Sequence, residues 1–132
     1  MRNQTEHKPF IFNEKFDKEL LFSLYEDDFP YMEEIFSITL TQLKPDILQL
    51  KAAFEAGITD DIRKSIHKIK PSYGFVGLPA VQELCKQFES ECTVAAVANE
   101  LSPSYQKLIG ILDESTNIIE SEYQKFKEYN QP

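Results

Sequence analysis

The sequence predicts an all-α protein: an antiparallel four-helix bundle of two long and two shorter helices, with a short N-terminal capping helix. Apolar residues recur every three or four positions along nearly the whole chain, which is the spacing of one helix face. No stretch alternates apolar and polar residues, and the hairpin turns Asn-Gly and Asp-Gly do not occur. Short connections between the helical segments favour antiparallel neighbours.

The chain divides into an N-terminal arm, residues 1–13, and one helical domain, residues 14–132. The arm lacks a clear pattern, and we expect Phe10 and Phe12 to pack on the domain. The first helix is predicted at 14–25, because its apolar residues gather on one side. These residues are Phe16, Leu20, Leu21 and Leu24.

The second helix is predicted at 30–56, where apolar residues follow one another at intervals of four and three. They are Phe36, Leu40, Leu43, Ile47, Leu50 and Phe54. The pattern stays in phase across Pro45, which predicts one helix that is kinked there and not ended. Gly57 is a suitable C-cap, since glycine readily adopts the left-handed conformation.

The third helix is predicted to begin with Thr59 as N-cap and to end by Gly77. Pro79 suits the first turn of a fourth helix. Its expected buried face consists of Val81, Leu84, Cys85, Phe88 and Cys92. The stretch "VAAVANEL", residues 94–101, fits either the tail of this helix or a loop.

The last helix is predicted to begin with Ser102 as N-cap and Pro103 at the first helical position. It extends to about residue 128. Its apolar face consists of Tyr105, Leu108, Leu112, Ile119, Tyr123 and Phe126.

Composition restricts the function. The chain has 132 residues, the size of one domain, with 42% hydrophobic and 27% charged residues, as in ordinary globular proteins. The net charge of -8 argues against a nucleic-acid partner, because phosphate-binding proteins need a broad basic face. No segment approaches the length of a membrane span, so we expect no membrane partner. Nothing in the pattern demands a dimer, and we expect a monomer.

The two cysteines indicate a reducing compartment. Cys85 and Cys92 are seven positions apart in a helical segment, too far for a disulfide at about 1.5 Å per residue. We interpret them as small buried apolar residues. The N-terminus also lacks the apolar run of a secretory signal. Together these features predict a cytoplasmic protein.

Most catalytic and metal sites find no support in the sequence. It contains no glycine-rich phosphate loop, and neither of its two histidines has a neighbour at metal-ligand spacing. We therefore expect no metal and no cofactor. The paired acids Asp27–Asp28 and Asp60–Asp61 stand at helix starts, where capping explains them better than catalysis. Both cysteines fall on an apolar face, which argues against a Cys-His nucleophile.

A basic window surrounds His67. Arg63, Lys64, Lys68 and Lys70 are four of the chain's 14 basic residues, and this window contains no acid. At about 100° per residue, His67 lies about 130° from the apolar face of the third helix, so we expect it to reach solvent.

Two interpretations of His67 follow from these residues. It is either an ordinary surface histidine on a Lys-rich helix face, or a nucleophile for a phosphoryl group. A neutral imidazole has a free ring nitrogen near neutral pH, and nearby cations can neutralise phosphoryl charge. Pro71 and Gly74 leave the same face without long flexible side chains.

The segment "HKIKPSYGFVG", residues 67–77, resembles the signature of histidine-containing phosphotransfer (HPt) domains, roughly H-x-[LI]-K-G-[SA]-[SA]-x-x-x-G. The matching positions are His67, Ile69, Lys70, Ser72 and Gly77. The continuation "LPAVQELCKQFE" resembles the family's next segment, with Cys85 and Glu89 in place. The resemblance covers about residues 14–128 and identifies the domain as an HPt-like four-helix bundle.

The resemblance implies that His67 accepts a phosphoryl group and relays it between the aspartates of receiver (response-regulator) domains in a two-component phosphorelay. A hybrid sensor histidine kinase is the other implied partner. The chain would be a phosphocarrier and not an enzyme, since the receiver supplies Mg²⁺ and the acidic pocket. By the same resemblance, Lys70 would steady the phosphoryl oxygens and Glu89 would orient the imidazole.

We expect a docking face made of Arg63, Lys64, Pro71 and Gly74, whose charge suits an acidic partner. Pro71 departs from the family pattern, which has glycine at this position. We expect it to kink the third helix just beyond the site and to stiffen the docking face. Tyr73 replaces a smaller residue and faces the core, so its size concerns packing.

Two other functions remain open. The dimerisation and phosphoacceptor domain of a sensor kinase usually has an acid directly after its histidine, whereas Lys68 stands here, and the chain has no ATP-binding part. A helical adaptor that binds a partner without phosphotransfer is the second alternative, and Pro71 is the best argument for it.

Overall fold

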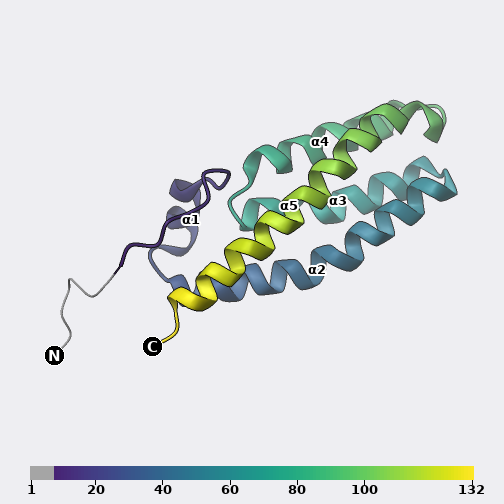
Figure 1. Ribbon diagram of the computed structural model, residues 1–132. Helices are drawn as coiled ribbons and strands as arrows, with labels where there is room; N and C mark the ends of the chain where they lie inside the picture. Colours follow the sequence, from purple (N-terminus) through teal and green to yellow (C-terminus); the bar gives the residue numbers. More distant parts are fainter. Residues whose placement is uncertain (1–7) are drawn as a thin grey trace.

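The computed structural model describes residues 8–132, which form five α-helices and one short 3-10 helix, without a strand (Figure 1). The elements are α1 (Lys18–Tyr25), α2 (Phe29–Ala56), α3 (Thr59–Phe75), α4 (Pro79–Val94), η2 (Ala98–Leu101) and α5 (Ser102–Tyr129). The four long helices lie alongside one another, and α1 lies at one end. The all-α prediction is therefore confirmed for this part of the chain.

The long helices enclose one apolar core, in which α3 packs most closely against α4 and α2. The predicted seam of α2 faces this core: five of its residues are buried, and Phe54 stacks on Tyr105 with 3.8 Å between ring centroids. The buried five are Phe36, Leu40, Leu43, Ile47 and Leu50. On α3, Ile66, Ile69 and Tyr73 are fully buried, so the opposite face of this helix is turned towards solvent.

Both prolines of interest lie inside continuous helices. α2 runs through Pro45 to Ala56, and Gly57, with a φ of 77°, is the predicted left-handed C-cap. α3 runs through Pro71 to Phe75. Because proline has no amide hydrogen, the carbonyl of His67 loses its usual helical donor. The segments before and after Pro71 nevertheless belong to one helix, and a kink there stays a prediction.

The start of α1 differs from the prediction of a helix at 14–25. The helix begins at Lys18, because Asp17 is the N-cap and its side chain accepts the amide hydrogen of Leu20 at 3.0 Å. The amide of Asp17 also donates to the carbonyl of Gly77 at 2.8 Å. These bonds hold the preceding residues in a turn that buries Phe16.

Two N-cap predictions are wrong. Thr59 and Ser102 are the first residues of their helices, while Ile58 and Leu101 occupy the cap positions without a side-chain bond. Ser102 cannot cap because η2 leads directly into α5, so its backbone is already helical. Residues 94–101, which fit either a helix tail or a loop in the sequence, form the end of α4, a short connection and η2.

Leu84 is less buried than the sequence predicts. The helix period places it on the buried face of α4, but it is 37% exposed, because α4 packs less closely on α5 than on α3. Cys85, Phe88 and Cys92 are buried as predicted, and neither cysteine is in a disulfide.

The described part of the arm packs on α5. Phe10 stacks on Phe126 with 4.4 Å between ring centroids, and Phe12 lies edge-on to the same ring. The amide of Asn13 donates to the buried carboxylate of Glu122 at 2.9 Å. These contacts confirm the expectation for the two phenylalanines; residues 1–7 of the predicted arm lie outside the described residues.

Tyr73 points into the core, and among the described residues its hydroxyl is a buried polar group without a hydrogen-bond partner. Burial raises the pKa of this phenol well above its usual value. We expect Tyr73→Phe to raise the free energy of unfolding by about 1 kcal/mol, because an unpaired buried polar group is removed. Urea unfolding with an unchanged m-value measures this change.

Tyr25→Phe is the matched control. The hydroxyl of Tyr25 donates to the carbonyl of Phe75 at 2.6 Å, so its removal should destabilise the protein by about 1 kcal/mol. Equal losses of stability in both variants would show that the Tyr73 hydroxyl has a partner.

Candidate functional site

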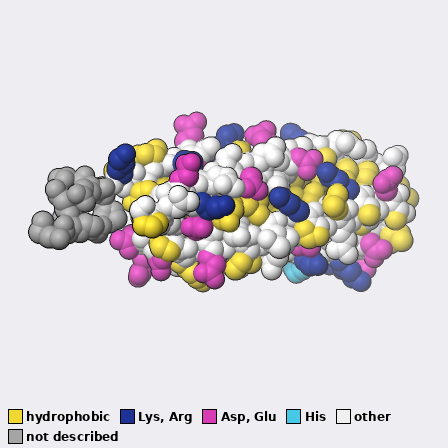
Figure 2. All heavy atoms as spheres, turned by 60° about the horizontal axis from the view of Figure 1, so that its bottom comes forward, with side chains coloured by type: hydrophobic (Ala, Val, Ile, Leu, Met, Phe, Trp, Pro, Cys, Tyr) yellow, Lys and Arg dark blue, Asp and Glu magenta, His cyan; other side chains and the backbone are white. Residues whose placement is uncertain are grey.

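His67 lies on the outer face of α3, as the helix period predicts, and 65% of its side chain is exposed. The neighbouring Ile66 and Ile69 are fully buried, so the packing of α3 determines the direction in which the imidazole points. In the space-filling view, the histidine side chain lies at one end of a row of Lys and Arg side chains (Figure 2).

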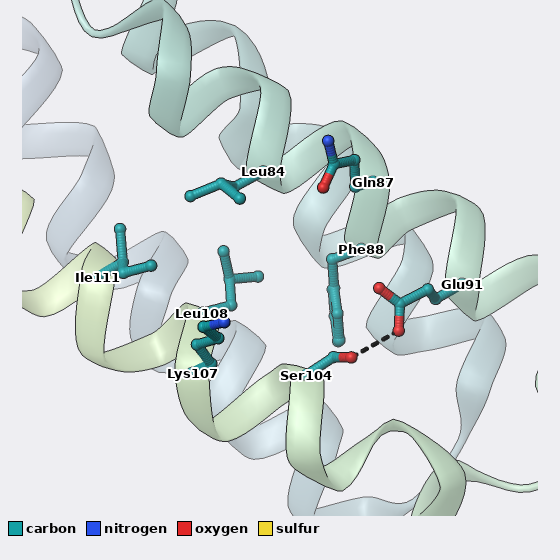
Figure 3. Close-up of a pocket in the computed structure, with 8 residues that line it drawn as sticks. All are labelled: Leu84, Gln87, Phe88, Glu91, Ser104, Lys107, Leu108 and Ile111. Atoms are coloured by element: carbon teal, nitrogen blue, oxygen red, sulfur yellow. Dashed lines mark hydrogen bonds between the residues drawn. The ribbon is translucent and has the colours of Figure 1, made fainter.

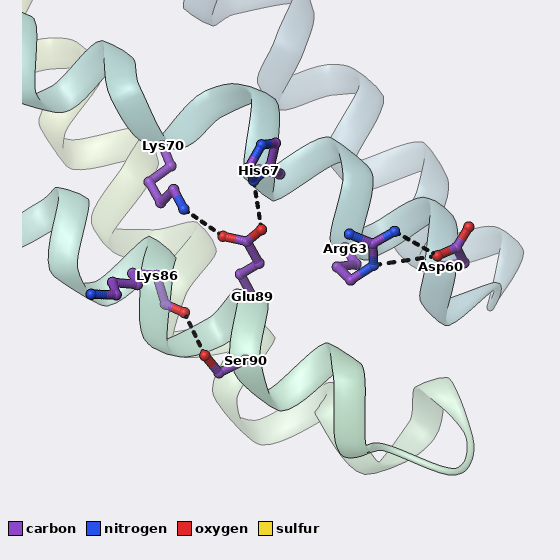
Figure 4. A network of polar contacts seen from close by, with 7 residues as sticks. All are labelled: Asp60, Arg63, His67, Lys70, Lys86, Glu89 and Ser90. Carbon is purple, nitrogen blue, oxygen red and sulfur yellow. Dashed lines mark hydrogen bonds and ion pairs between the residues drawn. The ribbon is translucent and has the colours of Figure 1, made fainter.

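Glu89 from α4 joins His67 and Lys70 of α3 (Figure 4). Its Oε2 atom lies 2.6 Å from Nδ1 of His67, and its Oε1 atom accepts a hydrogen bond from Nζ of Lys70 at 2.7 Å. The structure thus brings together the three residues that the sequence singled out for acceptance, stabilisation and orientation. Their roles in phosphotransfer stay predictions.

The protonation of this group follows from its contacts. Partial burial acts to raise the pKa of Glu89, but hydrogen bonds from Lys70 and His67 outweigh it and leave this pKa below its usual value. Glu89 is therefore an ionised carboxylate that can only accept hydrogen bonds. Its contact with Nδ1 requires the proton on that nitrogen, which leaves the lone pair of Nε2 free in the neutral ring.

The remaining cations of the window each have an acidic partner. Arg63 Nη2 lies 2.8 Å from Asp60, and Lys64 Nζ lies 3.1 Å from the same carboxylate. Lys68 Nζ lies 3.3 Å from Asp46, which belongs to α2. Neither of these contacts is predicted from the sequence. Asp60 stands three and four residues before its partners, a spacing that favours ion pairs on a helix. No local signal indicates Asp46, because its contact with Lys68 depends on the register of two helices.

Pro71 and Gly74 differ in exposure. Pro71 is exposed, as expected for the docking face. Gly74 is only partly exposed, and a Cβ atom there would lie 2.8 Å from Oε1 of Gln82 on α4. The missing side chain of Gly74 therefore makes room for Gln82, and this position is less open than the helix period predicts. Its part in docking stays a prediction.

The buried thiols do not contribute a nucleophile. Burial raises the pKa of Cys85 to about 12 and that of Cys92 to about 11, so both are neutral thiols at physiological pH.

His67 is open to solvent, with 65% of its side chain exposed. It does not line any of four hollows found elsewhere on the described surface. One of them, of about 220 Å³, lies between α4 and α5, where Ser104 donates to Glu91 at 2.6 Å (Figure 3). An imidazole on an exposed helix face is accessible to a group that another macromolecule carries.

Within residues 8–132, no group of three or more His, Cys, Asp or Glu side chains is arranged to hold a metal ion. In the same range, no helix has both the length and the apolar character of a membrane span.

Comparison with known proteins gives two matches. The family model of the Hpt domain matches residues 34–121, a span that includes His67 and Glu89. Among solved structures, the chain is similar to the HPT domain of an Hpt sensor hybrid histidine kinase from Shewanella, with a TM-score of 0.72 and 17% sequence identity. This match covers 84% of the present chain and 95% of the other, and at this identity it shows the fold alone. No curated protein sequence matches the chain.

The contact with Glu89 predicts one tautomer of His67. At mildly alkaline pH, nitrogen NMR should find the proton on Nδ1 and none on Nε2. Glu89→Ala should allow the ring to sample both tautomers, because the acceptor that fixes Nδ1–H is lost.

Glu91→Ala is the control, since Glu91 lies on the same helix but contacts Ser104 and not His67. A ring that keeps its proton on Nε2 in the unaltered protein would contradict the assigned hydrogen bond.

Proposed function

The chain belongs to the Hpt domain family, and on this premise we propose that it relays a phosphoryl group between receiver-domain aspartates in a two-component phosphorelay. His67 is the proposed acceptor. The observation that carries the proposal is the hydrogen bond between Nδ1 of His67 and Glu89, at 2.6 Å on an open helix face. It supports an exposed Nε2 lone pair that a partner's phosphoryl group can reach.

The proposed step is an in-line transfer. The Nε2 lone pair attacks the phosphorus of a receiver's aspartyl phosphate, the P–O bond breaks, and its electron pair returns to the aspartate as a carboxylate. The imidazole becomes a cation that keeps its proton on Nδ1. The carboxylate of Glu89 stabilises that charge and holds the ring plane in place. In the reverse direction the P–N bond breaks and the ring becomes neutral again.

Lys70 supports the same chemistry. It lies three residues after His67 on the side that faces α4, where Glu89 holds its ammonium group at 2.7 Å. An ammonium group has three donors, so Lys70 can keep this contact and also donate to a phosphoryl oxygen. Glu89 would thus fix the positions of both the nucleophile and the nearest cation.

The proposal makes the chain a phosphocarrier and not an enzyme, because the receiver would supply Mg²⁺ and the acidic pocket. Its partners would be receiver domains and a hybrid sensor histidine kinase, and it would act as a cytoplasmic monomer. Arg63, Lys64, Pro71 and Gly74 would form the docking face. The helices α2, α3, α4 and α5 would form the antiparallel bundle that presents this face, with α1 as its cap.

The direct test is incubation with phosphorylated receiver domains from the source organism. We expect acid-labile, alkali-stable phosphate on the protein, and no label on the His67→Gln variant. His7→Gln is the matched control, since His7 is the other histidine of the sequence, and it should be labelled like the unaltered chain.

Because His67 is exposed, His67→Gln should unfold like the unaltered protein, so its loss of label reports chemistry and not stability. Labelling of His67→Gln would refute the assignment of the acceptor. An absence of transfer from every receiver would favour the helical adaptor.

Glu89→Gln tests the charge of the orienting group. The amide keeps the shape of the side chain but loses its charge, so we expect a single-turnover transfer rate about tenfold lower, the difference between a charged and a neutral hydrogen bond. Rapid-quench kinetics with a phosphorylated receiver measures this rate.

The affinity for the receiver should change little, because Glu89 lies mostly beneath the surface, with 17% of its side chain exposed. Glu91→Gln on the same helix is the control. An unchanged transfer rate with weakened receiver binding would show that Glu89 contributes to docking and not to transfer.

A further inference from the structure

The site holds an ion pair that a phosphoryl group on His67 would disturb. Arg63 donates to Oδ1 of Asp60 from Nη2 at 2.8 Å and from Nε at 3.3 Å. Lys64 Nζ lies 3.1 Å from Oδ2 of the same carboxylate. One acid thus holds two cations in the helical turn before His67. Figure 4 shows its pair with Arg63.

The cations lie on two sides of His67. At about 100° per residue, Arg63 and Lys70 lie on one side of it and Lys68 on the other. Lys70 contacts Glu89, which identifies the first side as the one that faces α4. The pKa of Arg63 is raised mainly by its hydrogen bond with Asp60, and also by the charge of Glu89, which agrees with this placement.

Arg63 and Lys70 therefore lie about one helical turn before and one turn after His67, on the side of α3 that faces α4. Side chains four residues apart on a helix are neighbours. A phosphoryl group on His67 would therefore have the long side chains of Arg63 and Lys70 within one helical turn.

We infer that Asp60 is the resting counter-ion of Arg63, and that Arg63 exchanges this carboxylate for the phosphoryl group when His67 is phosphorylated. The inference rests on the proposed function for the assignment of His67 as acceptor. Arg63 would be a second cation, besides Lys70, that binds the phosphoryl group. Asp60 would compete with the phosphoryl group for Arg63.

The charges of the two acceptors favour the exchange. A phosphoryl group carries more negative charge than a carboxylate and offers three oxygens to the guanidinium fork. The negative charge of Asp60 also remains stabilised when Arg63 leaves it. It is the second residue of α3, where the positive end of the helix dipole stabilises an acid, and Lys64 remains beside it.

The contact between Arg63 and the phosphoryl group can be tested without a receiver domain, by measuring the lifetime of phosphohistidine. Phosphoramidate is the donor: the Nε2 lone pair attacks its phosphorus, the bond to the amine nitrogen breaks, and ammonia leaves. Hydrolysis then breaks the P–Nε2 bond, returns the electron pair to the ring, and adds a water oxygen to phosphorus, which gives inorganic phosphate. The phosphoryl oxygens lose negative charge in the loose transition state. A cation that holds them slows hydrolysis.

The experiment follows the phosphorus NMR signal of phosphohistidine at mildly alkaline pH. Arg63→Gln should shorten its lifetime about two- to fivefold, the size expected for an exposed charge contact. Asp60→Asn should lengthen the lifetime, because it frees Arg63. Lys68→Gln is the matched control: it removes one positive charge on the side that faces α2 and should leave the lifetime near that of the unaltered protein.

The double variant Asp60→Asn/Arg63→Gln shows whether Asp60 affects the lifetime through Arg63. If Asp60 acts only through Arg63, the double variant should have the lifetime of Arg63→Gln alone. An Asp60→Asn effect that persists without Arg63, or equal effects of Arg63→Gln and Lys68→Gln, would overturn the inference. Circular dichroism of each variant checks that it is folded.

The outcomes for the two proposals are separable. If phosphoramidate labels His67 and the variants give the expected order but no receiver exchanges phosphate with it, the relay function fails and the inference stands. If receivers exchange phosphate normally and Arg63→Gln has no effect, only the inference fails. If neither phosphoramidate nor a phosphorylated receiver labels His67, both fail together.

Discussion

The contact of Glu89 with α3 is the interaction on which the site depends. Its two oxygens bind His67 and Lys70, so one carboxylate holds an imidazole and a cation at 2.6 and 2.7 Å. This geometry needs a constant distance between α3 and α4, which pack closely on one another. Ile66 and Phe88, the neighbours of His67 and Glu89 in the sequence, are both buried in the core. Core packing thus sets the position of a group that itself lies at the surface.

The balance of charge around His67 is the second constraint. Each cation of the basic window is paired with an acid, so the site is much less positive than its sequence indicates. A phosphoryl group would therefore act mainly by redistributing these pairs. The pairs of Asp60 with Arg63 and Lys64 lie at the surface and contribute little to stability, so α3 can exchange them without a change of fold.

The periodicity of the sequence predicted what depends on one helix at a time: the extent of α2, the buried face of α3 and the exposure of His67. It could not predict what depends on two elements. The contact of Lys68 with Asp46 and that of Gly74 with Gln82 follow from the register between neighbouring helices. The prediction of Ser102 as N-cap is wrong for a related reason, because η2 directly precedes this residue and its backbone is already helical. The contact of Glu89 with His67 was anticipated only through the family resemblance.

Pro71 shows how packing outweighs local preference. Proline disfavours the helical conformation in the residue before it, here Lys70, and removes the donor to the carbonyl of His67. α3 nevertheless continues to Phe75. Ile69 and Tyr73 stand on either side of Pro71 and are fully buried, so unwinding the helix there would expose both. Burial of two large side chains is worth several kcal/mol, about the cost of an interior proline. The core therefore holds Lys70 in a helical position beside His67, where its contact with Glu89 is possible.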